Sequence, residues 1–301
     1  MQDREQLWAL AQEAMEAFGP FYREAMTAAA QATGAPNEWG ALNFARGAQP
    51  APFALDRFHA LVPYSARKRL AEILETLLRL ELLERVGEDA YRLTGQGLEA
   101  VAGVFQAAQE KLAAVKPLPA KDMARLNGLL FRVVKATLES PEPKDKWAIA
   151  YSRWTDPGKG AAPSVLTDQY LTDLVRYRDD AHIAAWKPFG VGGQAWEALT
   201  FVWRGDARTA AELAEKLPFR GHSAESYADA LADLSARGWV KQTPEGYAAT
   251  EKGAALRQEA EDATNRLFFA PWARLSDMES VELRGLLTRL RDTLQAMSES
   301  H

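Results

Sequence analysis

The sequence predicts a mainly α-helical protein with small β-hairpins, built from two successive copies of one unit. Three observations predict it. Four short motifs occur in the same order in both halves, apolar residues recur at helical spacing through most of the chain, and each half contains two short strand-like segments around a tight turn. We therefore expect the second half to repeat the fold of the first.

The four repeated motifs lie 155 to 157 residues apart. They are YREA from Tyr22 and YRDD from Tyr177, WGALNFARG from Trp39 and WEALTFVWRG from Trp196, YRLTGQG from Tyr91 and YAATEKG from Tyr247, and NGLLFRVVKATL from Asn127 and RGLLTRLRDTL from Arg284. Any one match could be coincidence. Four matches in one order at nearly one offset indicate a tandem duplication.

The repeat divides the chain into a first copy at residues 1–140, a linker at 141–164 and a second copy at 165–301. The linker is rich in proline and glycine, which break regular structure. Its tryptophans, Trp147 and Trp154, suggest that it packs on a surface.

Within the first copy the pattern predicts helices on either side of Gly19-Pro20, short helices over 39–46 and 55–61, and a longer helix with Ser65 as its N-cap. Strands follow over 82–86 and 91–93. The second copy repeats this order, with helices over 196–203, 209–217 and 223–237 and strands over 239–241 and 247–249. Three short helices followed by a hairpin is the order of a winged helix-turn-helix domain.

After each hairpin come two further helices, and the last one in each copy carries an apolar stripe. The stripes are Leu126, Leu129, Leu130, Val133, Val134 and Leu138, and Leu283, Leu286, Leu287, Leu290, Leu294 and Met297. We expect the two stripes to pack together and make an intramolecular pseudo-dimer. Periodicity alone equally allows packing inside each copy.

These motifs resemble the MarR group of bacterial regulators. YRLTGQG and YAATEKG resemble that group's L-T-x-x-G ending to the wing, and EAEDATNRLFFAPWARLSDMESVELRGLL resembles its long dimerisation helix, loop and final helix. The second half also resembles a poorly characterised actinobacterial-type helix-turn-helix family. The MarR resemblance implies two winged lobes, recognition helices that bind palindromic double-stranded DNA, and ligands bound between lobe and dimer helices. A duplicated chain would supply both halves as a monomer.

The candidate recognition helix of the first copy begins with positive and hydrogen-bonding residues, which suit DNA phosphates and base edges. The predicted DNA-binding residues are Arg57, Tyr64, Ser65, Arg67, Lys68, Arg69 and, in the wing, Arg92. A solvated helix end is the alternative. The equivalent helix of the second copy carries Glu225, Asp229 and Asp233, which repel phosphate. We therefore expect DNA contacts mainly in the first copy.

A ligand site is predicted in the second copy. If its first helix includes residues 177–186, Arg178, His182 and Trp186 share one face, near Trp196. A charged group, an imidazole and indoles could line a pocket for a small-molecule effector. The alternative is that His182 is a hydrogen-bonded interface residue.

Other function classes are disfavoured. The chain has no cysteine, which excludes thiolate metal sites and disulfides, and its net charge is −5. We find no catalytic motif, metal motif, cofactor motif, signal peptide or membrane span, and we expect a cytoplasmic protein that is not an enzyme. The sequence thus favours a DNA-binding transcriptional regulator. The alternative is a ligand-binding or protein-interaction module that descends from such a regulator and no longer reads DNA.

Overall fold

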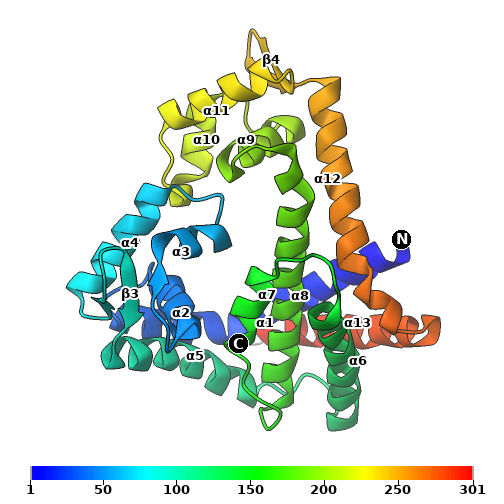
Figure 1. Cartoon of the computed structure of the whole chain (residues 1–301). Coiled ribbons are helices and arrows are strands. Elements are labelled where there is room, and N and C mark those ends of the chain that lie inside the picture. Colours follow the sequence, from blue (N-terminus) through cyan, green and yellow to red (C-terminus); the bar gives the residue numbers. More distant parts are fainter. Residues whose placement is uncertain (1, 300–301) are drawn as a thin grey trace.

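Both halves of the chain contain the same succession of elements in the computed structural model, which describes residues 2–299 (Figure 1). Residues 1, 300 and 301, at the ends of the two predicted copies, lie outside this range. The first half comprises α1 (Gln2–Ala32), α2 (Trp39–Ala48), β1 (Phe53–Ala54), α3 (Leu55–Leu61), α4 (Arg67–Arg79), β2 (Leu83–Arg85), β3 (Ala90–Leu93), α5 (Gly95–Ala114) and α6 (Ala120–Glu139).

The second half follows a short linker helix, α7 (Trp147–Arg153). It comprises α8 (Pro163–Trp186), α9 (Gly193–Arg204), α10 (Ala210–Lys216), α11 (Ala224–Ala236), β4 (Val240–Thr243), β5 (Gly246–Ala249), α12 (Glu251–Phe269) and α13 (Asp277–Glu299), with 3₁₀ turns at Lys187–Phe189, Pro218–Arg220 and Pro271–Arg274. We call residues 39–93 the first lobe and residues 193–249 the second lobe.

Most predicted elements are found within a few residues of their expected bounds, and four differ. The two predicted N-terminal helices form one continuous α1 that runs through Pro20, because apolar residues on both sides of the proline, such as Phe18 and Ala30, are buried. Ser65 is not the N-cap of α4: the flanking residue is Ala66, which makes no side-chain cap. The linker contains α7, and the first lobe has an additional strand, β1.

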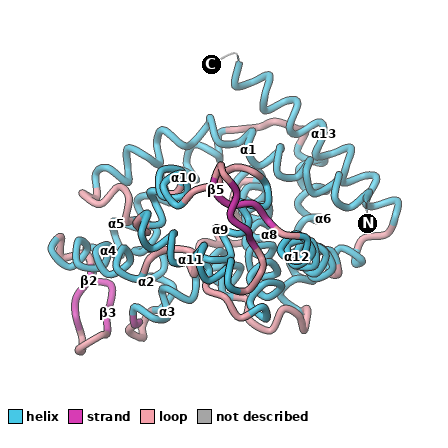
Figure 2. Tube along the Cα trace, turned by 90° about the horizontal axis from the view of Figure 1, so that it is seen from above, coloured by secondary structure: helices cyan, strands magenta, loops and turns pink. Residues whose placement is uncertain are grey.

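The two hairpins are antiparallel and differ in their partners. In the first lobe the strand order is β1-β3-β2, with Phe53 opposite Tyr91 and Leu83 opposite Leu93. In the second lobe β4 pairs only with β5. Figure 2 shows the two hairpins in different regions of the molecule, with α8 and α12 side by side and nearly end-on.

Within residues 2–299 the buried apolar side chains form three clusters. Each lobe has its own cluster, and the largest one lies between α1, α6, α8 and α13. Both predicted stripes contribute to this shared cluster, although Leu138 is 45% exposed. No helix in the described part of the chain combines the length and the apolar character needed to cross a membrane.

The central helices of each half pack against helices of the other half. α13 of the second half packs along α1 of the first, and α6 of the first half packs along α8 of the second. The two stripes therefore meet mainly through these partners rather than face to face. α6 and α13 also contact each other directly, through ion pairs at their exposed edges.

These ion pairs follow a reciprocal pattern. Arg132 pairs with Glu279, and Asp122 pairs with Arg289 at 2.9 Å. A shift of 157 residues converts the first pair into the second. Arg125 donates from Nε to a carboxylate oxygen of Glu282 at 2.9 Å, and these two residues are themselves 157 positions apart. Contact between a position and its own equivalent is the geometry found on a twofold axis.

The linker is anchored to both halves. The carboxylate of Asp180, on α8, accepts hydrogen bonds from the backbone N–H groups of Ala148 and Ile149 at the start of α7. At the other end of α7, the guanidinium of Arg46 donates to the carbonyl of Trp154 at 2.8 Å. The linker therefore packs against both halves.

Candidate functional site

The wing of each lobe is fixed to the following helix by a threonine. Thr94 precedes α5, where its hydroxyl accepts a hydrogen bond from the N–H of Gly97 and donates to the carbonyl of Glu81 at 2.7 Å. In the second half, Thr250 accepts from the N–H of Gly253 in the same way. The repeated T-x-x-G motif is therefore a helix cap that also binds the chain entering the hairpin.

Four of the seven residues predicted to bind DNA are exposed: Arg57, Arg67, Lys68 and Arg92. Arg67 forms an ion pair with Asp56, and Arg92 forms one with Glu84 at 2.8 Å. The ammonium of Lys68 has no ion pair or hydrogen bond to any residue in 2–299. Exposed ion pairs of this kind are weak, so phosphate can compete for all these cations. The assignment of these four residues stays a prediction.

The remaining three are Tyr64, Ser65 and Arg69. Tyr64 and Ser65 precede α4, and Arg69 lies in its first turn, at the end of the helix that faces the second half. We call residues 62–66 the α3–α4 turn and residues 217–223 the α10–α11 turn. The backbone N–H of Ala66 donates to the carbonyl of Arg220 at 2.7 Å, and His222 Nε2 donates to the carbonyl of Tyr64 at 3.0 Å. The turns that lead into the two candidate recognition helices therefore bind each other.

The contact between the turns is reinforced by aromatic groups. Trp186, at the end of α8, donates from Nε1 to the Tyr64 hydroxyl at 2.8 Å, and the Arg220 guanidinium lies 5.2 Å from the Tyr64 ring centroid. Burial raises the pKa of Tyr64 above its ordinary value. The Tyr64 hydroxyl thus lies between the halves, engaged by an indole, instead of on an outer face.

This arrangement limits how DNA could be bound. Two recognition helices that enter successive major grooves lie about 34 Å apart on the duplex. Here the N-terminal ends of α4 and α11 adjoin each other through Ala66 and Arg220. Only one of these helix ends could enter a groove while the turns remain in contact.

The exposed face of α11 is acidic, as its sequence suggests. Glu225, Asp229 and Asp233 are all exposed, and only Asp233 has a cation beside it, Arg237 at 2.8 Å. A carboxylate-rich face is repelled by phosphate. Of the two candidate recognition helices, α4 is therefore electrostatically better suited to DNA.

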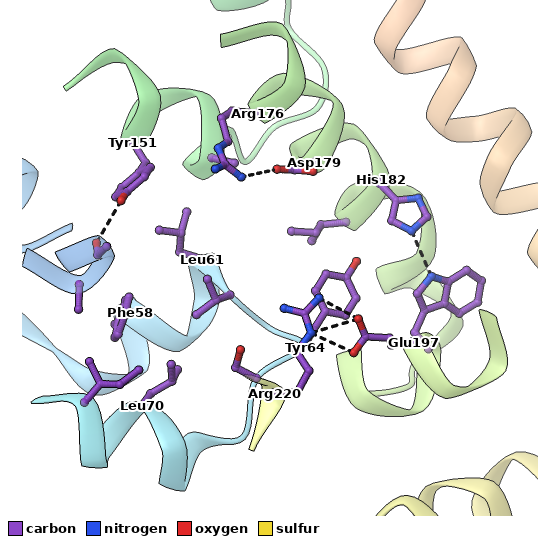
Figure 3. Close-up of a pocket in the computed structure, with 18 of the residues that line it drawn as sticks. Phe58, Leu61, Tyr64, Leu70, Tyr151, Arg176, Asp179, His182, Glu197 and Arg220 are labelled. Carbon is purple, nitrogen blue, oxygen red and sulfur yellow. Dashed lines mark hydrogen bonds and ion pairs between the residues drawn. The ribbon is translucent and has the colours of Figure 1, made fainter. Parts of the chain in front are cut away.

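A cavity of about 680 Å³ lies between the two lobes, with α7 and α8 forming part of its wall. Its first-lobe side is mostly apolar and includes Phe58, Leu61 and Leu70 (Figure 3). Its other walls carry charged groups that are paired with one another. A cavity with a mixed lining of this size is typical of small-molecule sites.

Two ion pairs contribute charge to this interlobe cavity, which is also lined by Glu38 and Arg204 (Figure 3). Arg220 forms a bidentate pair with Glu197, with a closest distance of 2.8 Å, and Arg176 pairs with Asp179 at 3.1 Å. Burial raises the pKa of the Asp179 carboxyl. Arg176 and Glu197 were not predicted from the sequence, because each is an ordinary surface residue by its local pattern.

His182 lies in the cavity wall as a neutral imidazole. The Thr264 hydroxyl donates to the carbonyl of Ala260, so its oxygen is left to accept from His182 Nδ1 at 3.1 Å. His182 Nε2 then accepts from the indole N–H of Trp196 at 3.4 Å. Burial lowers the pKa of His182 to about 4. These two hydrogen bonds agree with the alternative interpretation of His182 as a hydrogen-bonded interface residue.

The structure separates the four residues predicted to bind a ligand. His182 and Trp196 line the interlobe cavity. Arg178 instead turns toward α12, where it donates to the Asn265 side chain at 3.0 Å. Trp186 stacks on Trp196, with ring centroids 6.0 Å apart, and binds Tyr64. The role of these residues in ligand binding stays a prediction.

Comparison with known proteins gives a match to a family model in the second half of the chain. Residues 161–299 match the model of a helix-turn-helix family. No curated protein and no solved structure matches the chain. The matched residues extend from just before α8 to the end of α13, which is the second half in full. The second half of this chain is thus similar to a helix-turn-helix family.

Proposed function

We propose that this chain is a cytoplasmic, DNA-binding transcriptional regulator of MarR-like type. In this proposal the chain arose by tandem duplication and acts as a monomer, with its two halves forming a pseudo-dimer. The shared order of elements, the repeated T-x-x-G cap and the helix-turn-helix match of the second half support it. The proposal includes no catalytic activity and no cofactor.

The reciprocal contacts between the halves support the pseudo-dimer. In a symmetric dimer, a contact between residues i and j recurs as one between j and i. The pairs Arg132–Glu279 and Asp122–Arg289 follow that rule, and Arg125–Glu282 places a position against its own equivalent. The α3–α4 turn and the α10–α11 turn precede equivalent helices and also contact each other.

In this proposal DNA binds mainly to the first lobe. The observation that carries it is the exposed cationic start of α4, where Arg67 and Lys68 stand at positions that Ala224 and Glu225 occupy in α11. Arg57 and Arg92 add positive charge to the same lobe. Cations at a helix start suit both phosphate contact and base readout.

A small ligand in the interlobe cavity would modulate this binding. The cavity is lined by both lobes, including Tyr64 of the α3–α4 turn and Arg220 of the α10–α11 turn. A ligand that prefers either the closed or an opened arrangement of the turns would shift the population between them. The accessibility of the α4 start would then depend on the ligand.

The test is a fluorescence-anisotropy titration of the full chain with duplex DNA from upstream of its own gene. We expect binding that weakens steeply with salt, and a loss of at least about tenfold in affinity for the R67A/K68A variant, with a salt slope smaller by about two. The matched control replaces Glu225 and Asp229 by Gln and Asn, which should leave affinity unchanged or slightly improved. Salt-insensitive binding, or equal effects of both variants, contradicts the proposal.

A second candidate function is a ligand-binding or protein-interaction module that no longer reads DNA. The specific observation that favours it is the contact between the two turns, which covers Tyr64 and partly covers Arg69. In that case no duplex should bind the wild-type chain at physiological salt. A variant that weakens the contact between the turns, such as Arg220→Ala, which removes the guanidinium beside the Tyr64 ring, should then also fail to bind DNA.

A further inference from the structure

A second, smaller cavity of about 330 Å³ lies between helices of the first half, the linker helix α7 and α8 of the second half. We call it the α7 cavity. Its lining comes from α1, α2, α5, α7 and α8, and includes the rings of Trp39, Phe105 and Tyr151. Trp39 and Phe105 meet edge to face, with centroids 5.7 Å apart. This volume and these aromatic walls suit a small organic ligand.

Asp168 is the unusual polar group in this cavity. Its Oδ1 atom is buried and accepts no hydrogen bond from any residue in 2–299. The other buried aspartates of α8 have hydrogen-bond donors. Asp173 accepts from Ser152, Arg153 and Gln169, and Asp180 accepts from two backbone N–H groups. The lack of a donor at Asp168 is therefore not a general property of α8.

A second acceptor lines the same cavity. Asn43, on α2, is only 1% exposed, and its Oδ1 atom also lacks a hydrogen-bond donor within the described residues. A buried polar atom without a partner is unfavourable by about 1 to 3 kcal/mol. Two such acceptors in one cavity therefore point to a missing donor.

Neither neighbouring arginine pairs with Asp168. Arg176 lines the α7 cavity but pairs with Asp179 at 3.1 Å. The guanidinium of Arg23 lies against Gly19 on its own helix, closely enough to fill the space that a methyl group there would occupy. Neither arginine supplies a hydrogen bond to Asp168.

We propose that the α7 cavity binds a small organic amine. Its ammonium group donates hydrogen bonds to Asp168 and Asn43, and its apolar body packs against Trp39 and Phe105. An ammonium carries three donors and no acceptor, which is what two unpartnered acceptor oxygens require. Aromatic rings also attract a cation over their faces. This site is separate from the interlobe cavity and does not depend on DNA binding.

The charged surroundings of Asp168 give the binding a pH dependence. The titratable or charged groups that line the cavity are Glu16, Tyr22 and Arg23 from α1, Tyr151 from α7 and Arg176 from α8; α2 and α5 contribute none. Burial raises the pKa of Asp168 to about 7 and that of Tyr22 to about 12. Because an ammonium pairs with the ionised carboxylate, affinity should rise about tenfold from pH 6 to pH 8 and then level off.

Calorimetric titration and thermal shift of the full chain test this proposal with three probes of similar shape. These are 2-phenylethylamine, the neutral 2-phenylethanol and the anionic 3-phenylpropionate. We expect the amine to bind and to stabilise the protein, and the other two to bind at least about tenfold more weakly. The D168N variant should lose the preference for the amine and the pH dependence. It should remain folded, since it removes a carboxylate that has no partner.

D89N is the matched control, because Asp89 is an exposed carboxylate in the first hairpin that does not line this cavity and makes no ion pair within residues 2–299. It should bind the amine as the wild type does. The proposal is overturned if the wild type fails to bind 2-phenylethylamine at millimolar concentration, if D168N binds it equally well, or if the carboxylate probe binds more tightly than the amine. If none of the three probes binds, the α7 cavity holds water only.

Discussion

The indole N–H of Trp186 donates a 2.8 Å hydrogen bond to the hydroxyl of Tyr64, across the boundary between the two halves. Tyr64 belongs to the turn that starts one candidate recognition helix, and Trp186 is the last residue of the helix that leads to the other lobe. One hydrogen bond therefore links the position of α4 to the position of the second lobe.

We expect Tyr64→Phe to lower the free energy of unfolding by about 1 to 2 kcal/mol, because the buried indole N–H loses its acceptor. Urea unfolding measures this change. Tyr247→Phe is the control, since the Tyr247 hydroxyl has no hydrogen bond within residues 2–299, and its effect should stay within about 0.5 kcal/mol. Equal effects of the two variants would show that the Trp186 contact contributes nothing.

The glycines of the T-x-x-G motif should be intolerant of even a methyl group. A Cβ atom at Gly97 would overlap the carbonyl oxygen of Leu82, and one at Gly253 would overlap that of Trp239. Each carbonyl is backbone that receives hydrogen bonds from the capping threonine and cannot easily shift. We expect Gly97→Ala and Gly253→Ala each to destabilise the chain by about 1 to 3 kcal/mol.

Gly95 offers a control within the same turn of α5. Nothing lies within 4 Å of a Cβ placed there, so Gly95→Ala should be neutral or stabilise by up to about 1 kcal/mol through helix propensity. Thermal unfolding of Gly95→Ala and Gly97→Ala, measured side by side, separates close packing from propensity. The steric argument fails if the two alanine variants unfold at the same temperature.

The second residue after each candidate recognition helix adopts a left-handed conformation, and the two halves differ there. Gly238 has φ +71°, whereas the first half places Glu81 at φ +56°. A side chain is disfavoured in this region by about 1 kcal/mol, and glycine is not. We expect Glu81→Gly to raise the free energy of unfolding by roughly 0.5 to 1 kcal/mol, and Gly238→Ala to lower it by about 1 kcal/mol.

Guanidinium unfolding of the two variants checks both signs in one experiment. The Glu81 side chain is exposed and makes no ion pair within the described residues, so its removal takes away no compensating contact. If Glu81→Gly destabilises the chain, backbone strain is not the dominant effect at this position.

Much of the fold could be predicted because its signals are local and repeated. The offset of 155 to 157 residues predicted matching elements in both halves, and the T-x-x-G motif predicted each junction between wing and helix. The continuity of α1 through Pro20 could not be predicted, because it depends on burial against helices that are distant in sequence. The linker helix α7 likewise depends on its cap by Asp180, which is 32 residues away from Ala148.

The candidate site could be predicted only in part. Arg178, His182 and Trp186 have a recognisable helical spacing, but of these three only His182 lines the interlobe cavity, together with Trp196. Asp168 and Asn43 have no local pattern that marks them, since their significance lies in hydrogen bonds that they do not make. The contact between the α3–α4 turn and the α10–α11 turn depends on how the lobes are placed in space, which no segment encodes alone.

His182 should make stability depend on pH. Its pKa is about 4 in the folded chain, against an ordinary value of 6.5, because burial disfavours the charged imidazolium. Between pH 4 and pH 6.5, His182 is more often protonated in the unfolded chain than in the folded chain. The contribution of His182 to stability is therefore complete above pH 6.5 and is lost as the pH falls toward 4, with a total of about 2 to 3 kcal/mol.

Buried aspartates oppose this trend, so the histidine must be isolated by a variant. Burial raises the pKa of Asp168 to about 7 and that of Asp180 to about 6. The contribution of these two aspartates to the stability of the fold is complete below pH 4 and is lost as the pH rises through those values. We expect the stability of the wild type relative to His182→Asn to fall by about 2 kcal/mol between pH 7.5 and pH 4.5. Urea unfolding of both chains at the two pH values measures this difference. Parallel pH profiles would mean that His182 is not held neutral by Thr264 and Trp196, and its burial in the cavity wall would then need another explanation.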